Sequence, residues 1–280
     1  MNINPHPTSD HGFAPELIAA ALADALAHRR QGQPALLAIS GLQGSGKSTF
    51  AAQVVALAQA QGLQAEALSI DDVYLTAAER RHLAEHVHPL LGTRGPPGSH
   101  DLPLAHAVLD AVAAGKPLRL PRFDKLGDDR LPESQWSLVS QPLDLLVMEG
   151  WLLGTPAEAD SALTTPLNDL ERTEDPDGIW RGYCNQTLAR DYPALWQRFD
   201  RLWLLKAPSF EIVSQWRGQQ EQALLAAEPG RKGMDRQQLQ RFLQHYERVS
   251  RQALRCLPTL AHQVLALDEQ RHPTVLASQR

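Results

Sequence analysis

Gly41-Leu42-Gln43-Gly44-Ser45-Gly46-Lys47-Ser48 is the stretch that decides the fold of this 280-residue chain. It matches the pattern G-x-x-x-x-G-K-[ST], whose glycines let successive backbone N–H groups converge on phosphate oxygens. An apolar run at 35–40 precedes it and an Ala-rich helical run at 49–59 follows it, which is the order of strand, loop and helix that the motif needs. The sequence therefore predicts a nucleotide-binding α/β protein.

The loop also predicts where the phosphates and a metal ion bind. Lys47 is expected to reach the β- and γ-phosphates and Ser48 to ligate Mg²⁺, above a helix N-terminus that adds partial positive charge. The buried apolar strand at 142–148 ends in Glu149, an acid that either holds the same metal ion or is simply solvated at a strand end. The predicted phosphate-binding residues are Gly41, Gln43, Gly44, Ser45, Gly46, Lys47, Ser48 and Thr49.

Asp71 and Asp72 follow a second predicted strand, 64–70. Ligands of a parallel α/β sheet gather beyond the carboxyl ends of its strands, and a kinase needs a carboxylate there to accept the proton of the attacking hydroxyl. The alternative is an ordinary turn or helix cap, where Asp is common. Adjacent side chains on extended backbone point to opposite faces, so the two acids are expected to have different catalytic roles.

Two later segments are candidates for a substrate site. The loop 92–101 is rich in Gly and Pro, and the segment 118–125 alternates apolar and charged residues as an edge strand or extended segment would. The alternatives for the loop 92–101 are an inert connector and a cap by Asp101 on the helix 102–114. The alternative for the segment 118–125 is a solvated charged surface. The candidate substrate-binding residues are Arg94, His100, Asp101, Arg122, Asp124 and Lys125.

Composition excludes several classes of protein. A formal net charge of −5 argues against a general nucleic-acid or membrane-surface binder. The two cysteines, Cys184 and Cys256, form no C-x-x-C pattern, so neither a disulfide framework nor a zinc site is expected. No apolar run reaches the roughly 18 residues of a membrane span. We expect a cytoplasmic protein with a small-molecule substrate.

The remaining patterns predict one domain over 1–280, with a loose N-terminus at 1–13. The expected fold is a parallel sheet of about five strands, including 201–206 and 263–267, with helices on both faces, among them 15–30 and 77–86. Residues 155–198 read as a helical insertion. Residues 209–254 read as a helical lid, in which helices to about 227 and from 235 flank a basic break. Arg217 and Arg231 are its candidate catalytic and nucleotide-binding arginines.

Taken together, these segments resemble the plant-type D-glycerate 3-kinases, a branch of the P-loop kinases near phosphoribulokinase, uridine kinase and pantothenate kinase. The family's usual Phe and Tyr are replaced by Val73 and Phe123, and 155–185 matches poorly. The similarity spans about 36–267 and rests on the phosphate loop together with Ser69-Ile70-Asp71-Asp72-Val73-Tyr74-Leu75, Arg94-Gly95, Gly98-Ser99-His100-Asp101, Pro121-Arg122-Phe123-Asp124-Lys125, Met148-Glu149-Gly150-Trp151-Leu152-Leu153-Gly154, Trp216-Arg217 and Gly233-Met234.

The resemblance implies a P-loop NTPase fold, ATP and Mg²⁺, and transfer of a phosphoryl group to D-glycerate to give 3-phosphoglycerate. It implies that Asp71 accepts the hydroxyl proton, with Asp72 as its neighbour or as a metal-side ligand. Arg122, Lys125 and His100 would meet the glycerate carboxylate and hydroxyls. Two alternatives stay open: a kinase of the same architecture acting on a nucleoside or pantothenate-like alcohol, and a nucleotide-dependent switch without an acceptor.

Overall fold

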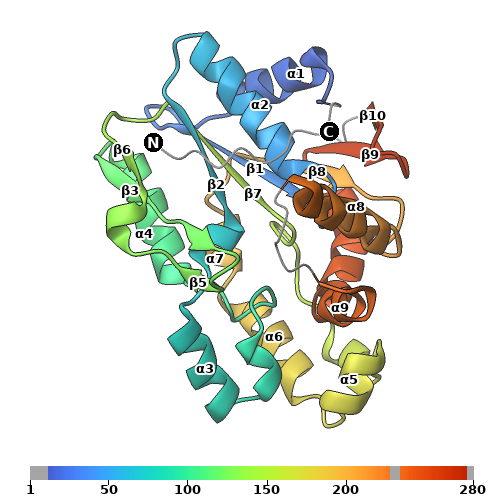
Figure 1. Ribbon diagram of the computed structural model, residues 1–280. Helices are drawn as coiled ribbons and strands as arrows, with labels where there is room; N and C mark the ends of the chain where they lie inside the picture. The colour runs from blue at the N-terminus through green and yellow to red at the C-terminus, as the bar shows by residue number, and fades with distance from the viewer. Residues whose placement is uncertain (1–11, 228–233, 276–280) are drawn as a thin grey trace.

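A six-stranded sheet forms the centre of the molecule (Figure 1). The computed structural model describes residues 12–227 and 234–275. Five strands are parallel, as predicted, and the sixth, β10, pairs antiparallel with β9 at one edge and was not predicted. The strands, in their order across the sheet, are β10 (Pro273–Val275), β9 (Gln263–Leu267), β8 (Arg201–Lys206), β1 (Ala35–Gly41), β7 (Leu145–Gly150) and β2 (Ala65–Ser69).

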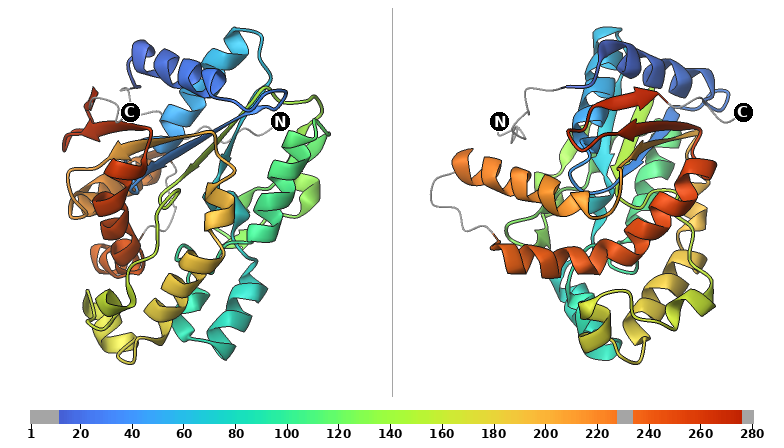
Figure 2. Two further views of the ribbon diagram at one scale, coloured as in Figure 1. Left: turned by 180° about the vertical axis from the view of Figure 1, so that it is seen from behind. Right: turned by 90° about the vertical axis from the view of Figure 1, so that its right-hand side faces the viewer.

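Helices cover both faces of the sheet (Figures 1 and 2), as predicted. The central strand β1 is buried along its whole length because its side chains enter two different cores. Leu37 and Ile39 pack with α1 (Pro15–Ala27) and α2 (Lys47–Ala60). Leu36 and Ala38 pack with α4 (Leu102–Ala113) and α7 (Pro193–Trp196). The first helix ends at Ala27 and not at Arg30, whose guanidinium instead pairs with Asp200 beside β8.

A smaller layer lies below the sheet in Figure 1. It contains α3 (Ala77–His86), the 3₁₀ turn η2 (Pro89–Gly92), α5 (Asp169–Glu174) and α6 (Ile179–Arg190), with the turn η4 (Asp160–Leu163) leading into it. A separate apolar cluster that includes Leu91, Leu170 and Trp180 holds these helices together. The segment 155–198, which the sequence marks as an insertion, supplies most of this layer.

Two long helices follow β8 and lie beside one another (Figure 2). Helix α8 spans Ile212–Ala227, so it begins three residues later than predicted, and α9 spans Arg236–Leu260, past the predicted end at Leu254. Arg231 falls between them, outside the described residues. Asp235 caps α9 through the backbone N–H of Gln238. None of the described helices has the length and apolar character that a bilayer crossing needs.

Short strands between α4 and β7 carry the predicted basic segment. Residues 118–125 do not form one edge strand, because β3 (Leu118–Leu120) pairs with β6 (Ser137–Val139) whereas β4 (Phe123–Asp124) pairs with β5 (Asp129–Arg130). The turn η3 (Glu133–Gln135) joins the two ribbons. We call residues 123–130 the β4–β5 hairpin. This hairpin brings the basic side chains back toward the end of β2.

Candidate active site

The phosphate loop joins β1 to α2 in a conformation that glycine makes possible. Gly44 and Gly46 have φ angles of 82° and 88°, in the left-handed region that disfavours other residues. A Cβ atom on Gly44 would also lie 2.6 Å from the Cβ of Trp216, a fully buried residue of α8. The loop is therefore packed directly against the first of the two long helices.

Several polar groups of this loop are suited to a phosphate. The side-chain nitrogen and oxygen of Gln43 and the hydroxyl of Ser45 are buried and find no hydrogen-bond partner in the described part of the chain. Burial lowers the pKa of Lys47, while the carboxylates of Glu149 and Asp71 act to raise it. The Lys47 ammonium donates to the Leu42 carbonyl at 3.3 Å. Anionic phosphate oxygens would accept hydrogen bonds from the Gln43 amide nitrogen, the Ser45 hydroxyl and the Lys47 ammonium.

Ser48 and Glu149 form the oxygen pair that the sequence predicts for a metal ion. The Ser48 hydroxyl donates to Glu149 Oε1 at 3.0 Å. The sheet register explains the meeting, because Glu149 on β7 lies opposite Ile39 on β1 and Ser69 on β2. Such an oxygen pair suits Mg²⁺, an ion that is usually bound by one or two protein oxygens together with phosphate and water.

Asp71 lies just beyond β2, and both of its carboxylate oxygens are occupied. The Tyr74 hydroxyl donates to Oδ1 at 2.7 Å and the Lys125 ammonium donates to Oδ2 at 2.8 Å. Burial acts to raise the pKa of Asp71, but the charge and hydrogen bond of Lys125, helped by Tyr74, outweigh it and hold this pKa well below the usual range. Asp71 is therefore a carboxylate whose surroundings fix its orientation.

The predicted extended backbone at Asp71 and Asp72 is wrong, because residues Ile70–Val73 form a 3₁₀ turn, η1. Ser69 caps the turn: its hydroxyl accepts from the Asp71 N–H, and the Asp72 carboxylate accepts from the Ser69 N–H. Asp72 also accepts from the Phe123 N–H at 3.2 Å and from Arg122 at 3.4 Å. Burial raises the pKa of Asp72 to about 6, against the lowering effect of Arg122. Asp72 thus ties the hairpin to β2.

Arg94, Asp124 and Asp128 shape the β4–β5 hairpin. Asp128 accepts hydrogen bonds from Arg94 and from Arg80, a guanidinium that is 1% exposed. Arg94 also lies over the ring of Phe123 and donates to the Lys125 carbonyl. Asp124 closes the turn by accepting from the Leu126 N–H. Arg94 and Asp124, predicted as substrate ligands, are therefore engaged in holding the hairpin.

His100 lies deeper in the same region, 5% exposed, and stacks on the Tyr74 ring at 4.7 Å between centroids. Its Nδ1 is 2.7 Å from the hydroxyl of Tyr192, which also accepts from the Gly98 N–H. Its Nε2 is buried without a partner in the described part of the chain. Burial lowers the pKa of His100 to about 4, so the ring is neutral at pH 7.

Asp101, another predicted substrate ligand, has both oxygens engaged elsewhere. Oδ1 caps α4 through the Leu104 N–H at 2.9 Å and Oδ2 accepts from Arg130 at 2.7 Å. The helix cap, which the sequence left open as an alternative, accounts for Oδ1, and the contact with Arg130 accounts for Oδ2.

Arg217 and Arg271 complete the surroundings of the phosphate loop. Arg217 on α8 donates to Gln220 and acts to lower the pKa of Lys47. Its Nε is buried and has no hydrogen-bond partner among the residues that the structure describes. Arg271 lies over the ring of Trp216 and donates to the Gly44 carbonyl at 2.7 Å. Sequence reasoning missed Arg271, as it missed Tyr74 and Tyr192. Of these three residues, only Tyr74 could have been found from the sequence, because it belongs to the motif that contains Asp71 and Asp72.

Comparisons with known proteins find similar kinases, although no protein-family model matches the chain. An uncharacterized kinase of Schizosaccharomyces pombe is 34% identical over 265 residues, which cover 88% of this chain and 92% of that protein. The chloroplastic D-glycerate 3-kinase of Arabidopsis thaliana is 29% identical over 227 residues, 76% of this chain and 46% of that protein. A D-glycerate 3-kinase structure from Cryptococcus neoformans has a TM-score of 0.76 and 25% identity, covering 94% of this chain and 97% of that one.

This chain belongs to the same family of kinases as the fission yeast protein, and it is similar in sequence and fold to D-glycerate 3-kinases. Membership confirms the predicted enzyme class, a phosphotransferase that uses an alcohol group as acceptor. It also makes a nucleotide switch without an acceptor the weakest of the three functional alternatives. The relatives do not share one named substrate, since the fission yeast protein is known only as a kinase.

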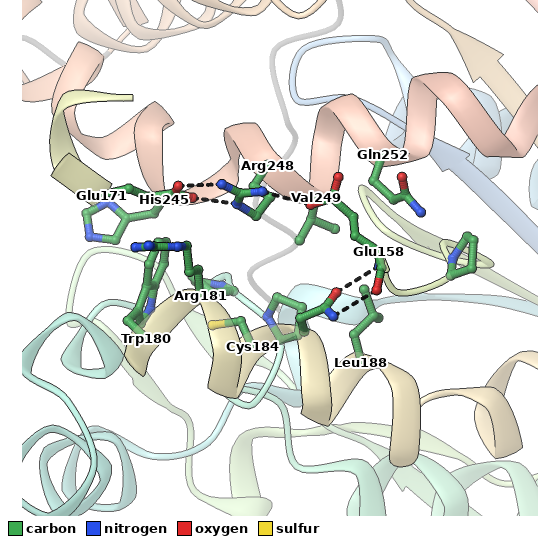
Figure 3. Close-up of a pocket in the computed structure, with 14 residues that line it drawn as sticks. Glu158, Glu171, Trp180, Arg181, Cys184, Leu188, His245, Arg248, Val249 and Gln252 are labelled. Atoms are coloured by element: carbon green, nitrogen blue, oxygen red, sulfur yellow. Dashed lines mark hydrogen bonds and ion pairs between the residues drawn. The ribbon is translucent and has the colours of Figure 1, made fainter. Parts of the chain in front are cut away.

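This family member also has a cavity away from the phosphate loop, between α6 and α9 (Figure 3). Figure 3 shows Arg248 reaching toward Glu158 and Glu171, and its guanidinium pairs with these carboxylates at 3.0 and 2.6 Å. The free volume is about 20 Å³, room for about one water molecule. A hydroxy acid does not fit in this cavity.

Proposed function

We propose that this kinase transfers the γ-phosphoryl group of ATP to a hydroxyl of D-glycerate, giving 3-phosphoglycerate. The observation that carries the proposal is the contact of Lys125 with Asp71. Asp71 acts electrostatically on Lys47 of the phosphate loop, while Lys125 belongs to the basic hairpin. The groups suited to the donor and those suited to an anionic acceptor therefore converge on one carboxylate.

In the proposed reaction, Asp71 accepts the proton of the acceptor hydroxyl. The hydroxyl oxygen forms a bond to the γ-phosphorus, the bond from that phosphorus to the β–γ bridging oxygen breaks, and ADP leaves. Lys47 and Arg217 neutralise charge that develops on the transferring oxygens. Ser48 and Glu149 would hold Mg²⁺, which, when bound, adds further neutralisation of the phosphates.

Residues near Asp71 favour an anionic acceptor over a neutral alcohol. Lys125 and Arg122 carry positive charge, and an arginine fork matches the planar geometry of a carboxylate. Neutral His100, with its unpartnered Nε2, is a candidate for an acceptor hydroxyl. A nucleoside or pantothenate-like alcohol has no carboxylate beside its reacting hydroxyl to use these charges.

The test is a coupled assay of ADP formation with ATP, Mg²⁺ and a panel of acceptors: D-glycerate, L-glycerate, glycerol, uridine and pantothenate. We expect kcat/KM to be highest for D-glycerate, and phosphorus NMR to identify the product as the 3-phosphate. The Lys47→Ala variant supplies the background rate. Turnover of D-glycerate no higher than this background would refute the proposal, and a higher kcat/KM for uridine or pantothenate would reassign the acceptor.

A further inference from the structure

Each carboxylate oxygen of Asp71 already accepts a hydrogen bond in this structure, and the donor on Oδ2 is a charged ammonium. Tyr74 holds Oδ1 and Lys125 holds Oδ2. A base must lie within hydrogen-bond reach of the proton that it accepts. A donor already held by the same oxygen competes for that place and weakens the affinity of the oxygen for a proton, so loss of one donor would make Asp71 a better base. The question is which donor leaves and what makes it leave.

Packing fixes the position of the Tyr74 side chain. Its side chain is 2% exposed, its ring lies between those of His100 and Phe123, and it follows η1 directly. Moving its hydroxyl away from Asp71 would require these packed rings to rearrange. Tyr74 is therefore the donor that stays, and it fixes the orientation of the carboxylate.

Lys125 is the donor that is free to move. Its side chain is 54% exposed, and it lies at the start of the turn of the β4–β5 hairpin. Arg80 donates to the Asp128 carbonyl and Asp72 accepts from the Phe123 N–H, which holds the backbone of the hairpin at both ends. The flexible four-carbon stem of Lys125 can therefore move while the backbone stays. Asp71 is also the strongest influence on the pKa of Lys125, which it raises. An ammonium that is paired with one carboxylate can readily exchange it for the carboxylate of a ligand.

We propose that Lys125 blocks Asp71 until an acceptor carboxylate draws it away. The ammonium occupies Oδ2 of Asp71 in the acceptor-free enzyme. The acceptor carboxylate replaces Asp71 as its partner, so the positive charge stays paired while Oδ2 becomes available to the hydroxyl of the same acceptor. This inference rests on the proposed function insofar as it takes the acceptor to be a hydroxy acid.

The consequence concerns water, which competes with every acceptor for the phosphoryl group. If Oδ2 were free, Asp71 would take a proton from water, the water oxygen would bond to the γ-phosphorus, and ADP and inorganic phosphate would form. Lys125 prevents this hydrolysis while no acceptor is bound. A neutral alcohol cannot compensate the ammonium, so it binds without releasing the base.

The experiment measures ATP hydrolysis without any acceptor in wild type and Lys125→Met. We expect the variant to hydrolyse ATP roughly tenfold faster or more, a modest share of what a general base contributes, and to have a higher KM for D-glycerate, whose carboxylate loses its charged partner. Adding Asp71→Asn to Lys125→Met should return hydrolysis to the wild-type rate. Lys125→Arg, which keeps a positive charge beside Asp71, should hydrolyse ATP as slowly as wild type.

Lys116→Met is the matched control, since Lys116 is an exposed lysine after α4 and touches no part of the site. Circular dichroism and thermal melting establish whether each variant is folded. Lys125→Arg tests the idea even if Lys125→Met does not fold.

Unchanged hydrolysis in Lys125→Met, or a rise that persists when Asp71 is also replaced, would overturn the inference. So would a higher KM for D-glycerate without faster hydrolysis, because Lys125 would then only bind the acceptor. The hydrolysis arm needs no D-glycerate, so it remains decisive if D-glycerate is not the acceptor.

Discussion

His100 is a buried residue of this site whose pKa is strongly lowered by burial. Its folded-state pKa is about 4, against about 6.5 for an unperturbed imidazole. Between these two values the unfolded chain binds more protons than the folded chain. Stability is therefore lost as pH falls from 6.5 toward 4. The neutral ring also keeps Nε2 available as a neutral hydrogen-bonding group beside Tyr74 at physiological pH.

We predict that lowering the pH from 7.5 to 5 costs the wild type about 2 kcal/mol more free energy of unfolding than it costs His100→Gln. Urea unfolding at the two pH values measures this difference. Glutamine keeps a side chain of similar polarity without titrating. Equal losses in the two proteins would show that His100 does not carry the pH dependence.

Sequence reasoning at the residue scale found the acids but not their partners. Asp71 stood out because it follows a strand next to the phosphate loop. Tyr74 belongs to the same motif, yet its hydroxyl reaches Asp71 only because η1 is a 3₁₀ turn and not extended backbone. That turn depends on the Ser69–Asp72 cap, a local competition between side chain and backbone that the strand pattern concealed.

The β4–β5 hairpin is the element on which acceptor binding depends. Its two strands are only two residues long each, so its shape comes from side chains outside the ribbon. Asp128, with a positive φ of 53°, receives Arg80 and Arg94, and Asp129 accepts from the Ala77 N–H at the start of α3. Buried Arg80 needs the Asp128 carboxylate, because an uncompensated buried charge is costly.

We predict that Asp128→Asn raises KM for the acceptor by about tenfold and leaves KM for ATP unchanged, since hydrogen bonds to a charged group contribute about 1.5–3 kcal/mol. Asparagine tolerates the left-handed backbone, so the change removes charge and not conformation. Steady-state kinetics with each substrate varied in turn measures both constants. Asp169→Asn, at an exposed carboxylate on α5, is the control. A parallel rise in both constants would mean that the hairpin supports the whole site.

Long-range contacts connect the C-terminal part of the described chain to the phosphate loop. The turn 268–272 between β9 and β10 returns to the phosphate loop, where Arg271 donates to Gly44 and the Trp216 indole donates to the Glu269 carbonyl. The sequence predicted the five parallel strands because each is an apolar run of its own. It did not predict Arg271, because 227 residues separate this contact and no local pattern marks it.

We predict that Arg271→Met raises KM for ATP by about tenfold, because the Gly44 carbonyl loses a charged donor and the phosphate loop loses one of its supports. Methionine keeps much of the apolar contact with Trp216. A thermal shift on adding the ATP analogue AMP-PNP should shrink correspondingly, since a ligand stabilises the folded state by mass action. The exposed arginine Arg172, replaced by Met, is the control. A KM for ATP equal to that of wild type would assign Arg271 to packing alone.

The central claim is that donor and acceptor meet at the carboxylate of Asp71, and the Asp71→Asn variant tests it most directly. Single-turnover transfer from ATP to D-glycerate and calorimetric titration with AMP-PNP are compared with wild type and with Asp110→Asn, an exposed acid on α4. We predict that the rate of transfer falls by about a thousandfold, within the range of general-base catalysis, while nucleotide affinity is unchanged. A transfer rate within tenfold of wild type would contradict the claim.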